Sequence, residues 1–291
     1  MSTSQDRDKK ILEQVRDIMR LNHYSIHTER SYCDWIKRYI SFHKMKSRAD
    51  LKEGELKIEQ FLTHIAVHEN VSPSTQNQAM NALVFLYKKV LEQPLDKKID
   101  AIRAKTKKNI PVVMSRDEVS NVISFMNGTP QLVTKLLYGS GLRIAEAIRL
   151  RVLDIDFSLK GIVVRSGKGN KDRVTTLPVS VSRILLHHLE GVKLLHEQDL
   201  SNGFGAVYLP YALERKYSKA SKEWQWQYVF PSKNFSTDPR TGKVRRHHID
   251  PSPINRAIKS AAKKAEINKK ISAHTFSYPN LNKIQTFFID T

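Results

Sequence analysis

The sequence predicts a mainly α-helical protein with a small antiparallel β-sheet, an α+β chain organised as two domains. Apolar residues recur at helical spacing in four segments within residues 8–101, which is typical of a compact helical bundle. Two β-branched runs, 161–165 and 173–177, flank a glycine-containing stretch and indicate a β-hairpin. The basic segment 102–112 has no periodicity and ends in a proline-containing stretch, so we place a linker between the domains there.

The N-terminal domain, residues 8–101, is expected to consist of four amphipathic helices. They are predicted from Lys9 to about Leu21, from Ser25 to His43, from Glu59 to His68, and from the Ser72-Pro73-Ser74 turn to Val90. Ser25 and Ser72 are residue types that cap helix N-termini. Basic side chains on the exposed faces are either solvated or contact a phosphate backbone, and we favour the backbone contact because the whole chain is basic.

The net charge is the strongest global property of the chain. It has 49 Lys and Arg against 29 Asp and Glu, a balance of +20 that is typical of proteins that bind a polyanion. No apolar run approaches the ~20 residues of a membrane span. The N-terminus has no apolar signal core, so we expect no export. The single cysteine, Cys33, excludes an internal disulfide and fits a reducing cytoplasm, and we expect it to be buried and inert.

The second domain, residues 113–276, is expected to combine helices with the predicted hairpin. Helices are predicted after the N-cap Ser115, over 131–138, over 181–195 and over 254–265. Residues 199–250 are rich in aromatic and basic side chains and are expected to form an irregular insert.

Arg143 follows the turn Gly139-Ser140-Gly141 and opens a helix that is predicted to reach Leu150. A helix dipole favours anions at this end, so an arginine there is unexpected. A phosphate partner would explain it, because phosphate binds both free backbone N–H groups and a planar guanidinium group. The alternative is a structural pair between Arg143 and Glu146, and this stretch alone leaves both interpretations open.

Lys168 and His274 are two further candidates for chemistry. Lys168 lies between glycines at the predicted hairpin tip, where it could enter a DNA groove or protonate a leaving oxygen; an ordinary exposed loop is the alternative. His274 follows Ser272, a potential N-cap, and could move protons or bind a phosphate oxygen; a core or capping histidine is the alternative. His64 and His68 have i, i+4 spacing, but Ile65 occupies the glutamate position of a zinc motif, so we predict no metal and no cofactor.

Together these segments resemble the tyrosine site-specific recombinases, and most closely the integron integrases. Arg143 lies in Gly-Leu-Arg-Ile-Ala-Glu, Lys168 in Gly-Lys-Gly-Asn-Lys and His274 in His-Thr-Phe, behind a helical bundle. The narrower resemblance rests on local matches, namely His23-Tyr24-Ser25-Ile26, Ser74-Thr75-Gln76-Asn77, Tyr208-Leu209-Pro210, Trp226-Gln227-Tyr228, Asp238-Pro239-Arg240 and Arg245-Arg246-His247-His248. It extends from about residue 10 to residue 276 and includes the insert at 199–250, which marks the integron subgroup.

The resemblance implies a two-domain clamp around DNA, made of a SAM-like core-binding domain and a catalytic domain. In the family, four protomers bring two sites together, and a tyrosine attacks the scissile phosphate to form a phosphotyrosyl link. The motif match implies that Arg143 is the first catalytic arginine, Lys168 the general acid and His274 the first histidine. Glu146 is expected to be structural. Fixed cations suit a pentacoordinate phosphate, so the resemblance implies no metal.

Integron integrases also recombine a folded single-stranded hairpin, which they recognise through bases that flip out of the stack. Such bases need flat partners and hydrogen-bond donors. The motif match gives this role to Trp226, Pro239, His247 and His248, and DNA contacts are further expected from Lys171, Arg245 and Arg246. A core tryptophan at position 226 and phosphate contacts by the two histidines are the alternatives.

The resemblance ends after Phe276. The family has an arginine three residues beyond the histidine, where this sequence has Ser277, and Tyr278 lies too close to His274 to be the nucleophile. Residues 277–291 are therefore interpreted as a tail from a frameshift or insertion junction. We expect an incomplete catalytic domain that is inactive or severely impaired in cleavage and lacks the segment that links protomers. The alternatives are a DNA-binding remnant that competes for attachment sites and a remnant without function. Apolar residues that should become exposed are Leu136, Leu137, Ile148 and Leu150.

Overall fold

The computed structural model describes residues 10–96, 98–105, 112–165, 171–209, 211–217 and 219–277. The chain divides into two compact units, Met1–Asn109 and Ile110–Thr291. The described part is mainly helical and contains two small antiparallel sheets, so the predicted α+β class is confirmed.

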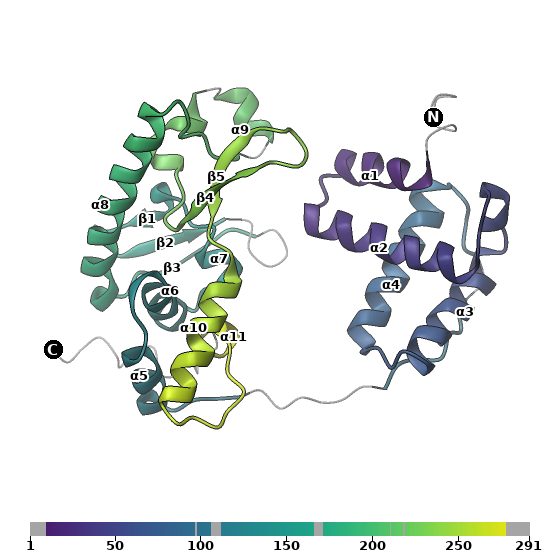
Figure 1. Ribbon diagram of the computed structural model, residues 1–291, viewed down its shortest axis with the longest axis horizontal. Helices are drawn as coiled ribbons and strands as arrows, with labels where there is room; N and C mark the ends of the chain where they lie inside the picture. Colours follow the sequence, from purple (N-terminus) through teal and green to yellow (C-terminus); the bar gives the residue numbers. More distant parts are fainter. Residues whose placement is uncertain are drawn as a thin grey trace. The chain divides into compact units, whose positions relative to one another are not determined.

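The first unit is a helical bundle (Figure 1). Its helices are α1 (Ile11–Leu21), α2 (Ile26–Phe42), α3 (Gly54–Val67) and α4 (Pro73–Phe85), with a short turn of 3₁₀ helix at Arg48–Leu51 and a π-helical stretch at Leu86–Val90. Ser25 and Ser72 cap α2 and α4 as predicted, because their hydroxyls accept hydrogen bonds from the backbone N–H groups of Thr28 and Thr75.

Helix α3 begins earlier than the sequence pattern indicates. It starts at Gly54, where an added β-carbon would lie 2.4 Å from the ring of Tyr87. A glycine is therefore needed for the close approach of this helix to the bundle core. Inside that core the hydroxyl groups of Tyr39 and Tyr87 are hydrogen-bonded over 2.8 Å, and the Tyr87 hydroxyl also reaches the Leu51 carbonyl at 2.9 Å.

Cys33 lies in the core of the first unit, as predicted. It is buried, and this burial raises the pKa of its thiol. A buried thiol with a raised pKa carries little thiolate at neutral pH and is a poor nucleophile.

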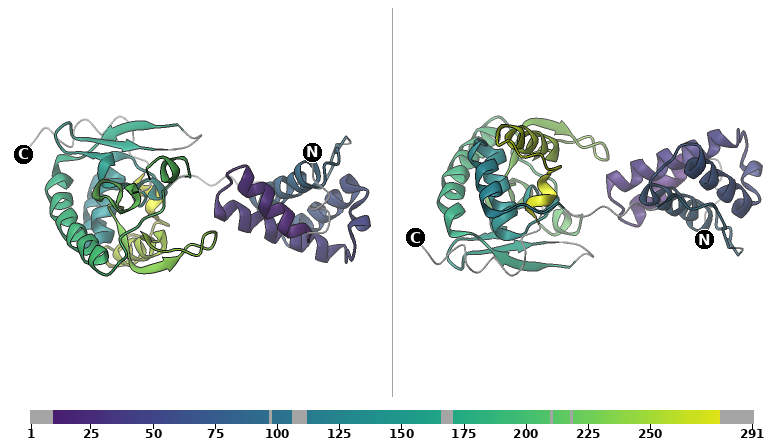
Figure 2. Two further views of the ribbon diagram at one scale, coloured as in Figure 1. Left: turned by 90° about the horizontal axis from the view of Figure 1, so that it is seen from above. Right: turned by 90° about the horizontal axis from the view of Figure 1, so that it is seen from below.

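The second unit packs helices around a three-stranded sheet (Figures 1 and 2). The sheet has the order β1 (Ile155–Asp156), β2 (Gly161–Val164) and β3 (Arg173–Thr176), all antiparallel. β2 and β3 form the predicted hairpin, with Val164 opposite Arg173, and β1 was not predicted. The hairpin tip with Lys168 lies outside the described residues.

Helix α6 is the centre of this unit. The helices are α5 (Arg116–Ser124), α6 (Gly128–Ser140), α7 (Ile144–Ala147), α8 (Val179–Ser201), α10 (Pro251–Lys264) and α11 (Ala273–Phe276), with a 3₁₀ turn at Val152–Asp154. α6 contacts α5, α7, α8, α10, α11 and β3. Ser115 caps α5 as predicted, and together with Glu118 it forms a capping box. In the described part of the chain, no helix combines the length and the apolar character that crossing a membrane requires.

The insert is more ordered than the sequence indicates. It holds α9 (Tyr211–Lys216), two short 3₁₀ turns at Ala220–Lys222 and Trp224–Trp226, and a hairpin of β4 (Pro231–Thr237) and β5 (Val244–His248). This hairpin was missed because β4 is mostly polar, so the alternation that marks a half-buried strand is absent. Its pairing is also irregular between Pro231 and Phe235.

One stability expectation is wrong. Leu136 and Leu137 are 0% exposed, and Ile148 and Leu150 are each 2% exposed. All four belong to one apolar core of the second unit, which also includes Phe230, Ile258 and Phe276. These four side chains are therefore covered within the second unit.

Candidate functional site

Arg143 is held at the start of a single helical turn. Helix α6 ends at Ser140, and Gly141 takes a left-handed φ of 64°, which reverses the direction of the chain. Leu142 is fully buried and anchors the turn, while the side chain of Arg143 stays 44% exposed. The helix that follows is α7, which is shorter than the predicted helix to Leu150.

Glu146 binds two arginines. Its carboxylate accepts hydrogen bonds from the backbone N–H and Nη1 of Arg143, at 2.8 and 2.9 Å. It also accepts from Nη1 and Nη2 of Arg173, at 2.9 and 2.7 Å. The Glu146 side chain is 9% exposed, against 44% for Arg143 and 35% for Arg173. The Arg143–Glu146 pair is thus present, as a structural interpretation of the sequence allows, but it is shared with a third residue.

The two arginines keep Glu146 ionised. Burial by itself would raise the pKa of this carboxyl, but the hydrogen bonds from Arg173 and Arg143 outweigh burial and lower the pKa to about 2. Two guanidinium groups and one carboxylate leave this cluster with one net positive charge. Such a cluster can bind an anion at the exposed guanidinium groups.

Arg173 was not identified from the sequence. It is the first residue of β3 and follows Lys171 and Asp172 on the strand side of the hairpin tip. Its partner Glu146 lies on a different element, and only the folded position of β3 beside α7 brings the two together. The one feature of the sequence that could have indicated Arg173 is its position as a basic residue next to a glycine-containing hairpin tip.

The other predicted catalytic residues are placed only in part. His274 is exposed on α11, which packs against α6, the helix that leads into Arg143. Ser277 stands at the C-terminus of α11, and its hydroxyl donates to the Ala273 carbonyl at 3.1 Å. Lys171 is exposed beside the hairpin tip. The roles of His274, Lys168 and Lys171 stay predictions.

Arg151 fastens the insert to the core of the second unit. Its guanidinium group donates to the carbonyls of Trp226 and Tyr208, at 2.7 and 2.6 Å, and to the Tyr228 hydroxyl at 3.2 Å. It also lies 3.9 Å from the centroid of the Tyr228 ring, a cation–π contact. Arg151 was not identified from the sequence either, because the hydrogen-bond partners of its guanidinium group lie in the distant insert.

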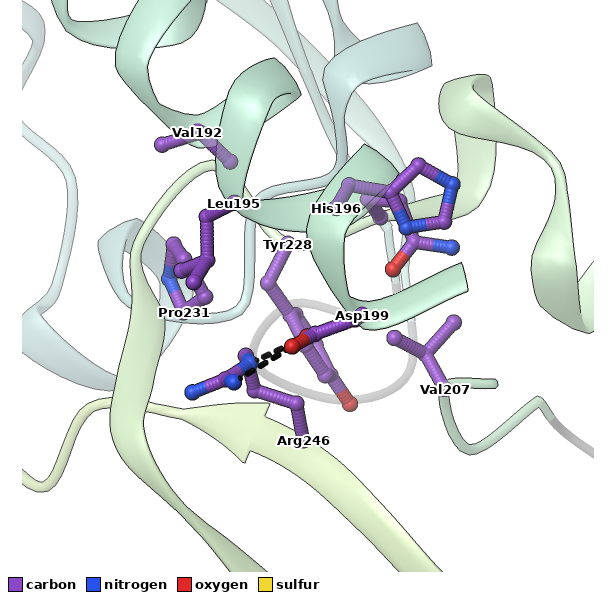
Figure 3. Close-up of a pocket in the computed structure, with 9 residues that line it drawn as sticks. Val192, Leu195, His196, Asp199, Val207, Tyr228, Pro231 and Arg246 are labelled. Atoms are coloured by element: carbon purple, nitrogen blue, oxygen red, sulfur yellow. Dashed lines mark hydrogen bonds and ion pairs between the residues drawn. The ribbon is translucent and has the colours of Figure 1, made fainter. Parts of the chain in front are cut away.

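Arg246 has a structural position inside the insert (Figure 3). Its Nε and Nη2 donate to the carboxylate of Asp199 over 2.5 and 2.7 Å. Its Nη1 donates to the carbonyls of Ser232 and Lys233, and its guanidinium group lies 4.2 Å over the ring of Phe235. All three nitrogens are therefore used within the protein. These contacts explain the position of Arg246 without DNA, and its predicted DNA contact stays a prediction.

Arg245, the neighbouring residue, is also turned inward. Its side chain is 7% exposed, and its Nη2 donates to Glu214 at 2.7 Å. Asp238 lies 3.9 Å from Nη1 of the same guanidinium group. Its predicted DNA contact likewise stays a prediction.

The aromatic residues of the insert lie close to one another. Trp226 is half-buried and packs against a small apolar cluster that includes Val207, Leu209 and Tyr228. The rings of His247 and His248 are 4.0 Å apart, and both lie within 5.4 Å of the Tyr228 ring. Pro239 is exposed in the turn between β4 and β5.

The two histidines are uncharged at neutral pH. Burial lowers the pKa of His248 to about 4, against the raising effect of its hydrogen bond to the Ile249 carbonyl, and nearby His247 and Arg149 lower it further. Loss of water around its ring also lowers the pKa of His247. A neutral imidazole has one donor and one acceptor nitrogen, and it lacks the charge that attracts phosphate.

The comparisons show the family. Residues 11–97 match the phage integrase N-terminal SAM-like domain, and residues 112–277 match the phage integrase family. The chain belongs to the phage integrase family of tyrosine recombinases, and this membership implies site-specific DNA recombination.

Its relatives include two integrase/recombinases, from Escherichia coli and from Pseudomonas aeruginosa. Each is 41% identical over 272 residues, which cover 94% of this chain and 80% of the relative. Tyrosine recombinase XerA of Thermococcus onnurineus is 30% identical over 190 residues, which cover 63% of this chain and 60% of XerA.

Solved structures share the fold at low sequence identity. The Tn1549 transposon integrase in complex with transposon right end DNA has a TM-score of 0.53 and 14% identity, over 92% of this chain and 84% of that chain. A λ integrase dimer bound to a COC′ core site has a TM-score of 0.53 and 12% identity, over 92% and 82% of the two chains.

Proposed function

We propose that this chain is an integron-type integrase whose partner is DNA, both a duplex attachment site and a folded single-stranded hairpin site. The insert carries the narrower part of the proposal, because it holds all four matched positions. Trp226 packs against the apolar cluster with Tyr228, His247 and His248 lie together at the end of β5, and Pro239 lies in the β4–β5 turn. The net charge of +20 and the DNA-bound relatives of the same fold support the DNA partner.

The insert suits recognition of an extrahelical base. Trp226 is half-buried, so part of its ring is fixed by packing and part is free to stack on a base. Nδ1–H of neutral His248 is used by the Ile249 carbonyl, so its Nε2 is left as a hydrogen-bond acceptor for a base edge. The lack of charge on His247 and His248 favours base contacts over phosphate binding.

In the clamp, domain 8–101 would contact the duplex from its basic helix faces and domain 113–276 would hold the scissile phosphate. Arg143 would bind this phosphate, and Lys168 and His274 take the motif positions that in the family protonate the leaving oxygen and move a proton or bind a phosphate oxygen.

We further propose that the chain binds its sites without cleaving them, and so competes for them with an active integrase. Ser277 stands where the family motif has an arginine, and its hydroxyl is used by the carbonyl of Ala273 within α11. A neutral serine does not stabilise the charge of a pentacoordinate phosphate, and loss of one such group costs roughly 10²–10³ in rate. Tyr278 follows it directly and is the only tyrosine in residues 277–291.

Base recognition is tested with Trp226→Ala. The probes are a synthetic hairpin oligonucleotide with one extrahelical base and the same hairpin fully paired. We expect the variant to lose roughly 5- to 100-fold in affinity for the first probe, as for one stacked base, and little for the second. Tyr217→Ala is the matched control, because Tyr217 is an exposed aromatic residue of the same insert. Equal losses on both probes would contradict base stacking.

Cleavage is tested separately with a nicked suicide duplex of an attachment site. We expect a shifted band on a native gel and no covalent protein–DNA adduct on a denaturing gel. An adduct would show that a nucleophile works in this chain, and the non-cleaving part of the proposal would then be wrong.

A further inference from the structure

Arg143 and Arg173 use the same carboxylate in different ways. Arg173 places both Nη nitrogens on Glu146, at 2.9 and 2.7 Å. Arg143 places only Nη1 and its backbone N–H there. Among the residues that the structure describes, no side chain or carbonyl binds Nε or Nη2 of Arg143, and this side chain is the more exposed of the two.

We propose that Arg173 is a positioning residue, which neutralises Glu146 so that Arg143 keeps its charge and one edge of its guanidinium group for a phosphate. This inference rests on the phosphate-binding role proposed for Arg143. It assigns Arg173 a place in the site although Arg173 is outside the set of residues expected to touch DNA.

The net charge of the Arg143, Arg173 and Glu146 cluster depends on Arg173. With both arginines the cluster has one net positive charge, and Arg173 gives the carboxylate two of the four hydrogen bonds that it accepts from this pair. Without Arg173, Glu146 would be left 9% exposed with a single cationic partner. A partly buried carboxylate draws such a partner into a two-pronged pair, so Arg143 would lose both its net charge and its free edge.

The same contact fixes the base of the hairpin that carries Lys168. Arg173 is the first residue of β3 and pairs with Val164, the last residue of β2. Its bond to Glu146 therefore joins the Val164–Arg173 pair, next to the hairpin tip, to α7 and the turn that holds Arg143. Directly after β2, Arg165 binds a different carboxylate, Asp154, at 2.6 Å. Arg165 is thus a matched control with the same charge and a similar salt bridge.

The experiment measures binding of inorganic phosphate to the full chain, followed by NMR of the arginine side-chain Nε–Hε groups. We expect a saturable shift of the Arg143 signal. Arg173→Gln should weaken phosphate binding roughly tenfold or more, the value of a hydrogen bond to a charged group. Arg173→Lys keeps the charge but loses the two-pronged contact, so its phosphate affinity should lie between those of Arg173→Gln and wild type. Arg165→Gln should leave the Arg143 signal and the affinity unchanged.

The decisive variant is Glu146→Gln combined with Arg173→Gln. It restores the net positive charge on Arg143, so phosphate affinity should return to within about threefold of wild type. If Arg173 only stabilised the fold, removal of its partner would bring no recovery. No recovery in a folded double variant, or an Arg173→Gln variant that binds phosphate like wild type, would overturn the inference.

A gel shift of duplex DNA with the wild-type chain separates this inference from the proposed function. Loss of the shift itself would count against DNA binding as a whole. A normal DNA shift with no response of the Arg143 signal to phosphate would count against the positioning role alone.

Discussion

Glu146 is ionised because two arginines hold it, and this makes its contribution to stability depend on pH. Its pKa is about 2 in the folded chain, against an ordinary value of 4.5. A lowered carboxyl pKa stabilises the fold above pH 4.5, and this stabilisation is lost as the pH falls toward 2.

We therefore expect the difference in unfolding free energy between wild type and Glu146→Gln to be largest above pH 4.5. This difference should shrink by up to about 3 kcal/mol as the pH falls toward 2. Chemical denaturation at a series of pH values measures this difference. A difference that stays constant over this range would show that the arginines do not depress the pKa.

His248 gives a second pH dependence in a separate range. Its pKa is lowered from 6.5 to about 4, so the folded chain holds it neutral while the unfolded chain protonates it first. The free energy of unfolding is not reduced by His248 above pH 6.5, and it should fall by on the order of 1–3 kcal/mol as the pH drops toward 4. His248→Gln should flatten the curve between pH 6.5 and 4. An unchanged curve would place the titration on another residue.

At the scale of elements, the β4–β5 hairpin depends on one buried ion pair. Arg246 and Asp199 are 9% and 6% exposed, and removal of one partner leaves a buried charge. Arg246→Ala should cost about 3–5 kcal/mol of unfolding free energy. Denaturant titration measures it, with Lys243→Ala, an exposed residue of the same hairpin, as a control expected to change stability by less than about 0.5 kcal/mol.

The same variant decides between the two roles of Arg246. A phosphate contact would lower the salt dependence of DNA binding by about one unit of slope, whereas a structural arginine would not. Because its three nitrogens are already bound within the insert, we expect an unchanged slope in the fraction that is folded.

Local signals predicted the elements that local chemistry determines. The caps at Ser25, Ser72 and Ser115 and the β2–β3 hairpin follow from residue types at fixed spacing, and the structure confirms them. The β4–β5 hairpin could not be predicted, because it is held by Arg246, which reaches Asp199 far away in the sequence. Arg173 and Arg151 were missed for the same reason, since each gains its role only from a distant partner.

At the scale of the whole molecule, the two units have separate apolar cores. Trp35 lies in the core of the first unit and is the only tryptophan of the chain before residue 224. A unit with its own core can fold independently. We expect a fragment of residues 10–105 to unfold cooperatively, with a Trp35 fluorescence midpoint within a few degrees of the first unit in the full chain.

A broad, non-cooperative transition of this fragment would show that the first unit needs the second one. For the second unit, the buried state of Leu136, Leu137, Ile148 and Leu150 removes the reason to expect a weak core. Its own unfolding can be followed in the full chain through Trp224 and Trp226.

We propose above all that this recombinase-family chain recognises folded single-stranded DNA through its insert. The most direct measurement is the affinity ratio between a hairpin oligonucleotide with one extrahelical base and its fully paired counterpart, at the same salt concentration. We expect at least a roughly fivefold preference for the hairpin with the extrahelical base, because one base stacks on the protein. Equal affinity for the two hairpins would contradict it.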